Sequence, residues 1–216
     1  MPSNLKCCIK KIIWPLVVIK RFIIQKHSIL HKTGWVDSFI LGYPCRSDGK
    51  PLPWMNYSII SFLEQRLNKT MRVFEFGSGY STLFYARFVE SVVAVEHNRE
   101  WFETMRPQVP ENSRIIFQEK DRDGQYCRTV KEPGVIFNLV VIDGRDRLHS
   151  LQQSLEVLAD DGVIIFDDSN RSEYREAMDY ARKSGFKAIH FCGLKPRSNS
   201  IFQTSILYRP HNCFDI

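Results

Sequence analysis

Two common devices for stabilising a small domain are missing from this sequence: a disulfide framework and a structural zinc site. Its six cysteines are scattered along the chain, with no C-x-x-C pair and no histidine at the spacing of a zinc ligand. We therefore expect reduced thiols, as is usual for a cytoplasmic protein. The 216 residues, 44% of them hydrophobic, are enough to bury one globular core. This composition excludes a disordered or fibrous protein.

Long hydrophobic runs are also absent. The apolar run at residues 12–19 (IIWPLVVI) ends at Lys20 after eight residues, whereas a membrane-spanning helix needs about 18 to 20. The residues that follow are basic or bulky, unlike the small residues of a signal-peptide cleavage site. The sequence therefore predicts neither a spanning helix nor a cleaved signal.

Acidic residues are missing from the first 36 positions. This arm holds seven basic residues, namely Lys6, Lys10, Lys11, Lys20, Arg21, Lys26 and Lys32. The rest of the chain carries 23 basic against 24 acidic residues, so the formal net charge of +6 arises in the arm. Because the body of the protein lacks the basic excess that phosphate contacts need, we expect no nucleic-acid partner.

The arm permits two interpretations. Six apolar side chains share one face of a helical wheel, although Pro15 interrupts the helix and Lys20 lies on that face; they are Ile9, Ile12, Ile13, Leu16, Ile19 and Ile23. In the first interpretation, residues 1–33 lie on an anionic membrane surface, peripheral to its inner face. In the second, the apolar face packs on the domain or on a second subunit.

Composition divides the chain into three segments: an arm or helix at residues 1–36, a linker and lid-like helix at 37–70, and an α/β domain at 71–216. The run GYPCRSDGKPLP at 42–53 holds three prolines and two glycines, which is typical of a loop. Apolar residues at helical spacing follow at 54–67. Trp54 and Tyr57 are either part of a lid over a ligand or an aromatic staple on the domain.

Strand-like apolar runs alternate with helical patterns in the third segment. The predicted strands are 72–76, 92–96, 114–117, 137–143, 162–167, 186–192 and 204–208, with helices near 80–89, 99–106, 147–158 and 171–184. Such alternation indicates a parallel sheet covered by helices on both faces. No helix separates the last two strands, so they are expected to form an antiparallel hairpin. The predicted fold class is α/β, with a doubly wound, mostly parallel seven-stranded sheet and an antiparallel C-terminal hairpin.

A glycine-rich turn follows the first strand directly, in the run EFGSGYST at 75–82. Gly77 permits a tight turn, and Gly79 permits close approach of a ligand to the backbone. The third glycine of a dinucleotide-binding fingerprint is missing, because Thr82 stands in its place. The Glu75 carboxylate would repel a pyrophosphate and attract a cation. Both features disfavour a nicotinamide cofactor.

The run VFEFGSGYST at 73–82 resembles the first motif of the class I S-adenosylmethionine-dependent methyltransferases, acid-x-Gly-x-Gly-x-Ser/Thr. The resemblance covers about residues 54–209 and implies a Rossmann-like methyltransferase domain with S-adenosylmethionine as its cofactor. In that family the acid contacts the cationic amino-acid part of the cofactor, directly or through water. The resemblance therefore assigns this role to Glu75 and places Gly77, Ser78, Gly79, Ser81 and Thr82 in the same pocket. Alternatively, Ser81 or Thr82 only caps the following helix.

Further cofactor contacts are expected at the ends of the second, third and fourth strands. Glu96 ends the second strand 19 residues after Gly77, a spacing at which a carboxylate accepts both hydroxyls of a ribose. His97 follows it and is placed beside the adenine. By resemblance, the residues after the third strand that could contact the adenine are Gln118, Glu119 and Asp121. Asp143 and Gly144 complete the predicted cofactor-binding set.

Acids after the fourth and fifth strands are candidates for the chemistry. Methylation of a hydroxyl requires that the hydroxyl lose its proton, and we predict Asp143 and Asp168 as catalytic residues. The alternative is a divalent metal held by Asp143, Asp167 and Asp168. Metal-dependent small-molecule O-methyltransferases resemble the chain at Asp143, but they have Asp-Asn where this chain has Asp-Asp-Ser. Two of the three neighbouring arginines, Arg145, Arg147 and Arg171, are expected to pair with these acids.

The runs VVIDGRDR and IIFDDSNR are similar to methyltransferases of the FkbM type, which methylate hydroxyls of sugars or natural products. The predicted function is therefore methylation of a small-molecule or glycan hydroxyl. A nucleic-acid base is disfavoured, since Asp-Gly-Arg-Asp stands where base-modifying enzymes often carry an Asn- or Asp-Pro-Pro-aromatic motif. The alternatives are an NAD(P)-dependent oxidoreductase and a non-catalytic, membrane-associated Rossmann-like module.

Overall fold

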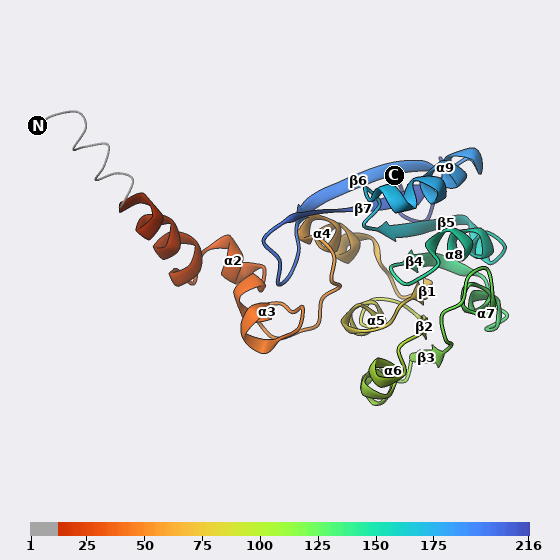
Figure 1. Ribbon diagram of the computed structural model, residues 1–216, viewed down its shortest axis with the longest axis horizontal. Helices are drawn as coiled ribbons and strands as arrows, with labels where there is room; N and C mark the ends of the chain where they lie inside the picture. Colours follow the sequence, from red (N-terminus) through yellow and green to blue (C-terminus); the bar gives the residue numbers. More distant parts are fainter. Residues whose placement is uncertain (1–12) are drawn as a thin grey trace, which may run out of the picture.

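The computed structural model describes residues 13–216, so Lys6, Lys10 and Lys11 of the predicted basic arm lie outside the described residues. A seven-stranded sheet with the strand order β3-β2-β1-β4-β5-β7-β6 forms the centre of the molecule (Figure 1). The strands are β1 Arg72–Phe76, β2 Ser91–Glu96, β3 Ser113–Phe117, β4 Phe137–Ile142, β5 Leu158–Asp167, β6 Lys187–Leu194 and β7 Ile201–Tyr208. The first five strands are parallel, and β7 runs antiparallel between β5 and β6. The predicted fold class is confirmed.

Helices cover both faces of the sheet. On one face lie α4 (Tyr57–Arg66), α5 (Tyr80–Ala86) and α6 (Arg99–Met105). On the other face lie α7 (Gln125–Arg128), α8 (Arg147–Ser154) and α9 (Arg175–Lys183). Because successive side chains of a strand point to opposite faces, β1 contributes Val73 to the first layer and Phe74 to the second. The central strands therefore bury apolar side chains on both faces.

Asparagine side chains fix the start of two of these helices. The Asn56 carboxamide oxygen accepts a hydrogen bond from the Ile59 amide at 3.1 Å, which begins α4. Asn98 does the same for the Trp101 amide at 3.0 Å, which begins α6 directly after β2. Both are ordinary N-caps, because the side chain satisfies an amide that has no partner inside the helix.

Several predicted boundaries differ from the structure. The helix predicted at 147–158 ends at Ser154, since β5 begins early, at Leu158. The terminal hairpin is longer than predicted because β6 and β7 each have eight residues. The boundary predicted at residues 36 and 37 falls inside a helix, α3 (Trp35–Leu41).

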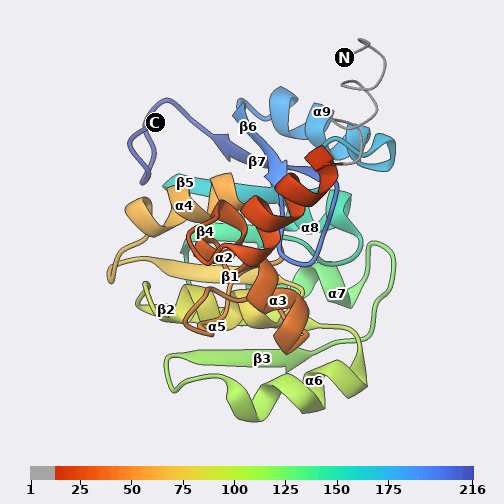
Figure 2. The same cartoon turned by 90° about the vertical axis from the view of Figure 1, so that its left-hand side faces the viewer.

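The N-terminal segment projects away from the domain (Figure 1). Residues 13–19 are helical and continue into a π-helical turn, η1 (Lys20–Ile24), which is followed by α2 (Ile29–Lys32) and then α3. Viewed from the arm side, the strands run lengthwise, and these elements stand in front of the sheet face that carries α4 and α5 (Figure 2). Within residues 13–216, no helix combines the length and the apolar character needed to cross a membrane.

A cavity at the carboxyl ends of the strands

The site lies where the strand order reverses, between β1 and β4. At such a switch point the loops after the two strands diverge and leave a crevice. Gly77 has a φ of 90°, which a residue with a side chain rarely adopts. A Cβ at Gly144 would lie 2.9 Å from the Gly77 nitrogen and still closer to the Tyr126 hydroxyl. The two turns are therefore packed backbone against backbone, which explains why both positions are glycine.

A cavity of about 530 Å³ opens above these turns. Its volume is within the usual range for a small-molecule site. The predicted site residues in its wall are Glu75, Gly77, Ser78, Ser81, Glu96, His97, Asp143, Gly144 and Asp168; the others are Asn98, Trp101, Arg145, Arg147, Arg171 and Tyr174. The structure thus brings together residues from the ends of four strands.

Glu75 is a buried carboxyl group at the floor of the cavity, with 1% of its surface exposed. The Thr82 hydroxyl donates to it at 2.5 Å. Burial raises its pKa to about 7, although hydrogen bonds from Ser81 and Thr82 lower it in part. No cationic side chain of the described residues forms an ion pair with it. A cationic group of a ligand would therefore supply the partner that Glu75 lacks.

Thr82 does not line the cavity. It is fully buried, and its hydroxyl oxygen accepts a hydrogen bond from the Gly79 amide at 3.0 Å while donating to Glu75. Thr82 therefore holds both the turn and the Glu75 carboxyl in position from behind. The prediction that Thr82 contacts the cofactor is corrected to this supporting role.

Glu96 is oriented by the backbone around it. One carboxylate oxygen accepts from the amides of His97 and Asn98 at 2.9 and 2.8 Å. The other accepts from the Ser78 amide at 3.1 Å and from the Ser78 hydroxyl at 3.3 Å. The hydroxyl contact is the longest of the four and the easiest for a ligand hydroxyl to replace. Glu96 is thus a fixed acceptor at the end of the cavity.

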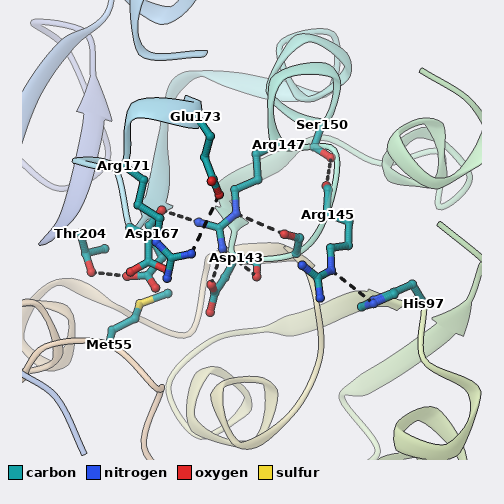
Figure 3. A network of polar contacts seen from close by, with 12 residues as sticks. Met55, His97, Asp143, Arg145, Arg147, Ser150, Asp167, Arg171, Glu173 and Thr204 are labelled. Atoms are coloured by element: carbon teal, nitrogen blue, oxygen red, sulfur yellow. Dashed lines mark hydrogen bonds and ion pairs between the residues drawn. The ribbon is translucent and has the colours of Figure 1, made fainter. Parts of the chain in front are cut away.

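His97 lies beside Glu96 and contacts Arg145. Burial lowers the pKa of His97, with a contribution from Arg145, although Glu96 opposes the shift. The Arg145 side chain donates to the His97 Nε2 at 3.4 Å (Figure 3). This bond requires a neutral ring with an unprotonated Nε2. His97 therefore forms a neutral part of the wall.

A buried arginine joins the ends of β4 and β5 (Figure 3). Arg147 is 7% exposed, and its guanidinium donates to the Asp143 carboxylate at 3.1 Å and to the backbone oxygens of Gly144 and Asp167. Its planar group also lies over the Tyr174 ring, at 4.5 Å from the ring centre. Burial raises the pKa of Asp143 to about 6 even though Arg147 lowers it. At neutral pH Asp143 is mostly an ionised acceptor.

The three acids proposed as metal ligands have other partners. Asp143 is paired with Arg147, and Asp168 with Arg171 at 2.5 Å. The Asp167 side chain accepts from the Thr204 hydroxyl instead. Over residues 13–216, no cluster of three or more His, Cys, Asp or Glu side chains is suited to a metal ion. The geometry therefore gives no support to the metal alternative, and two of the three arginines pair internally, as predicted.

Three further side chains near the site have partners that the sequence did not indicate. Asp146 contacts His149 at 2.6 Å and accepts from the Asp123 amide. Asp121 does not line the cavity; its carboxylate accepts from backbone amides at the start of α7. Ser169 contacts Ser205 and does not cap a helix. Asp121 is therefore held by neighbours close in sequence, whereas Asp146 and Ser169 also have partners 23 and 36 residues away.

Asp167 is the most perturbed of the three carboxyls. It is buried, and burial together with the neighbouring Asp143 raises its pKa to about 8. Thr204 donates to it, and Thr204 in turn accepts from the Asn56 side chain at 3.3 Å. The carboxyl therefore links the end of β5 to β7 and to the start of α4.

Replacing Asp167 with Asn is expected to reduce the pH dependence of stability. A carboxyl whose pKa is raised from 3.8 to about 8 on folding stabilises the fold fully below pH 4 and progressively less as the pH rises to 8. Asn cannot ionise but keeps an oxygen for Thr204, so we expect it to stabilise the protein at pH 8 by about 2 kcal/mol. Urea unfolding between pH 4 and 8 measures this difference. An equal effect at both ends of the range would contradict the assignment.

A second cavity of about 370 Å³ adjoins the first and shares Ser78, Ser81, Trp101 and Asp143 with it. Its remaining wall consists of Pro44, Trp54, Gly79 and Tyr80. Trp101 donates from its ring nitrogen to the Ser78 carbonyl at 2.8 Å, which fixes the ring between the two cavities. The cavity thus presents aromatic faces next to the Asp143 carboxylate.

The two aromatic residues of the predicted lid occupy different positions relative to this second cavity. Trp54 is partly exposed at its mouth, with the Arg197 guanidinium 5.8 Å from the ring centre. Tyr57 packs against the core, and burial raises its pKa to about 12. The sequence did not indicate Trp101 or Tyr80 as site residues; the position of Asn98 as N-cap directly after β2 is the signal that could have placed Trp101 there.

No protein-family model matches the chain, and no curated protein matches it in sequence. Solved structures do match in fold. The O-methyltransferase TomG of Streptomyces achromogenes, involved in tomaymycin synthesis and solved with S-adenosylmethionine, is 17% identical with a TM-score of 0.54, over 68% of this chain and 77% of that one.

Two other similar structures are of proteins whose names indicate different methyl acceptors. A precorrin-6y C5,15-methyltransferase of Geobacter metallireducens is 14% identical with a TM-score of 0.54, over 70% of this chain and 86% of that one. An rRNA methylase of Streptococcus thermophilus is 15% identical with a TM-score of 0.52, over 69% and 93%. At such identities the likeness concerns the fold. The chain has the fold of the class I S-adenosylmethionine-dependent methyltransferases.

Proposed function

We propose that this protein is an S-adenosylmethionine-dependent methyltransferase that methylates a hydroxyl group of a small molecule or glycan. The observation that carries the proposal is the pair of carboxylates in the larger cavity. Glu75 lacks a cationic partner among the described residues, and Glu96 is a fixed acceptor at the end of the next strand. The first matches an ammonium group and the second a ribose, which are both parts of this cofactor.

The residues present fit the cofactor. Glu75 would bind the ammonium group, with Ser81 beside it, and Glu96 would accept from the ribose hydroxyls. His97 and Trp101 would border the base, since both line the same cavity as Glu96. Gly77 and Gly144 line the same cavity, so the backbone of both turns would border the ligand. When bound, the cofactor supplies an electrophilic methyl group.

Asp143 is the residue best placed to handle the proton of an acceptor. It borders both cavities, so it lies between the proposed cofactor and anything bound against Trp54 and Tyr80. With a pKa of about 6 and Arg147 holding it in place, the carboxylate can accept a hydrogen bond and a proton at neutral pH. Asp168 is held by Arg171, so its proposed part is to orient the rim of the cavity.

The aromatic lining of the second cavity supports an acceptor with a ring. Trp54, Tyr80 and Trp101 offer flat apolar faces, on which sugar and aromatic rings pack well. The likeness to FkbM-type enzymes remains a prediction, as does the identity of the acceptor. The fold neighbours with O-methyltransferase names agree with a hydroxyl acceptor.

Calorimetry with S-adenosylhomocysteine, NAD and NADP tests the proposal against its alternatives. We expect the methyl-donor product to bind and both nicotinamide cofactors to fail, because the Glu75 carboxylate would repel a pyrophosphate bound at the glycine-rich turn. Binding of NAD without binding of S-adenosylhomocysteine would favour an oxidoreductase. Failure of all three would favour a non-catalytic module.

Glu96→Gln is expected to weaken S-adenosylhomocysteine binding about tenfold, because an amide accepts weaker hydrogen bonds from a ribose than a carboxylate does. 5′-Methylthioadenosine, which keeps the ribose but lacks the amino-acid part, should lose affinity by the same factor. Calorimetry with both ligands measures this. An unchanged affinity for 5′-methylthioadenosine would show that the ribose is bound elsewhere.

A further inference from the structure

The N-terminal arm exposes many apolar side chains that the domain does not cover. Between residues 13 and 24, eight large apolar side chains are each about half exposed or more: Ile13, Trp14, Leu16, Val18, Ile19, Phe22, Ile23 and Ile24. Leu16 and Ile24 are 64% and 66% exposed. No residue of the π-helical turn η1 is buried. The interpretation in which the arm packs its apolar face on the domain is therefore contradicted for these residues.

The same arm carries charge of one sign. Lys20 and Arg21 lie within the exposed apolar stretch, and Lys26 and Lys32 follow it. The first acidic residue of the chain is Asp37. Exposed apolar side chains together with unopposed positive charge are complementary to a surface that is apolar underneath and negatively charged outside.

The exposed apolar surface continues from the arm to the rim of the site. Phe39, Ile40 and Leu41 at the end of α3 are 48%, 75% and 49% exposed. The loop between β6 and β7 is tied to this helix, since the Trp35 ring nitrogen donates to the Ser198 carbonyl at 2.7 Å. Ile201, at the start of β7, is 78% exposed. The arm thus leads directly to Pro44 and Trp54, which line the second cavity.

We propose that residues 13–41 bind the surface of an anionic lipid bilayer. The arm lies in the interface, with its apolar side chains among the acyl chains and its basic side chains at the headgroups. Residues 13–41 do not cross the bilayer in this arrangement. Because α3 and the β6–β7 loop are joined, the second cavity opens close to the membrane, where an amphiphilic acceptor would be presented.

A second copy of this chain is a weaker occupant of the same surface. Two arms packed together would bring two acid-free segments of positive charge side by side, and like charges repel. An anionic membrane gains from each of these charges instead. The charge therefore favours lipid over self-association.

Sedimentation of the full-length protein with vesicles tests the proposal. The vesicles contain phosphatidylcholine alone or phosphatidylcholine and phosphatidylglycerol in a three-to-one ratio. We expect binding only to the anionic vesicles, weakening as salt is added. The double variant Lys20→Gln/Arg21→Gln should bind them on the order of tenfold more weakly. The double variant Phe22→Ser/Ile23→Ser should lose affinity for the anionic vesicles by a similar factor.

Two control variants carry the same kinds of substitution at exposed positions outside the arm. Lys183→Gln/Lys187→Gln removes two exposed charges near α9 and β6, and Ile136→Ser removes an exposed apolar side chain. Both should bind vesicles as the unchanged protein does. Three results would each overturn the proposal. They are an equal loss of vesicle binding in the controls, no vesicle binding by the unchanged protein, and a dimer in solution that the arm variants dissociate. S-adenosylhomocysteine calorimetry on every variant reports the proposed function separately, and circular dichroism confirms folding.

Discussion

Glu75→Gln is expected to weaken S-adenosylhomocysteine binding by about 100-fold, the larger of the two predicted cofactor effects. A buried ion pair that loses one partner typically costs 2 to about 5 kcal/mol, since the other charge is left without a counterion. Among the described residues, the close donors to the buried Glu75 carboxyl are hydroxyl groups, and no cationic side chain pairs with it. Glutamine keeps the shape and the Thr82 hydrogen bond but removes the charge.

The binding of a ligand without an ammonium group provides the internal control. 5′-Methylthioadenosine lacks the amino-acid part, so Glu75→Gln should leave its affinity unchanged. Glu103→Gln, at an exposed position on α6, should affect neither ligand. If Glu75→Gln weakened both ligands equally, the variant would be perturbing the whole cavity and the assignment of Glu75 to the ammonium group would fail.

The affinity for S-adenosylhomocysteine should also depend on pH in the unchanged protein. With a pKa of about 7, Glu75 must lose its proton before it can pair with an ammonium group. Affinity should therefore rise as the pH increases from 6 to 8, and the rise should be much smaller in Glu75→Gln. Calorimetry across this range measures both curves.

Arg147→Met is expected to lower the free energy of unfolding by about 3 to 5 kcal/mol at pH 8. Arg147 is buried and Asp143 is half-buried at the cavity wall, so removing the guanidinium leaves a poorly solvated carboxylate without its counterion. Here the substitution also removes the donors to the backbone oxygens of Gly144 and Asp167 that join β4 to β5. Urea unfolding measures the loss.

The destabilisation by Arg147→Met should decrease toward low pH. Without the guanidinium, the pKa of Asp143 rises above its present value of about 6, so the carboxyl is neutral at pH 5 and no longer needs a counterion. Adding Asp143→Asn should recover part of the loss at pH 8. Arg145→Met, an exposed position with a single contact to His97, should cost less than about 1 kcal/mol. A loss equal at both pH values would refute the pairing.

The fold and the main acids of the site could be predicted because they depend on local patterns. The alternation of apolar strands and amphipathic helices is repeated along the chain, and parallel strands place their carboxyl ends at one edge. Glu75, Glu96 and Asp143 each lie at or next to the carboxyl end of a predicted strand. Their convergence in one cavity follows from that rule alone.

The partners of those acids could not be predicted from spacing. Asp146 contacts His149, one helical turn away, and also the Asp123 amide, which comes from another loop. Thr204 lies 37 residues from Asp167 and reaches it only because β7 returns antiparallel beside β5. Trp101 reaches Ser78 because α6 begins at the end of β2.

By itself, the sequence determined the order of strands and helices, the glycine-rich turn with its acid, and the separation of a basic arm from a nearly neutral body. The tertiary structure decided which charges are neutralised and which surfaces are covered. It paired Asp143 with Arg147 and left Glu75 unpaired among the described residues. It also left the arm exposed. The physical reason is that burial and ion pairing depend on neighbours brought together by folding, whereas periodicity and turn chemistry depend on neighbours along the chain.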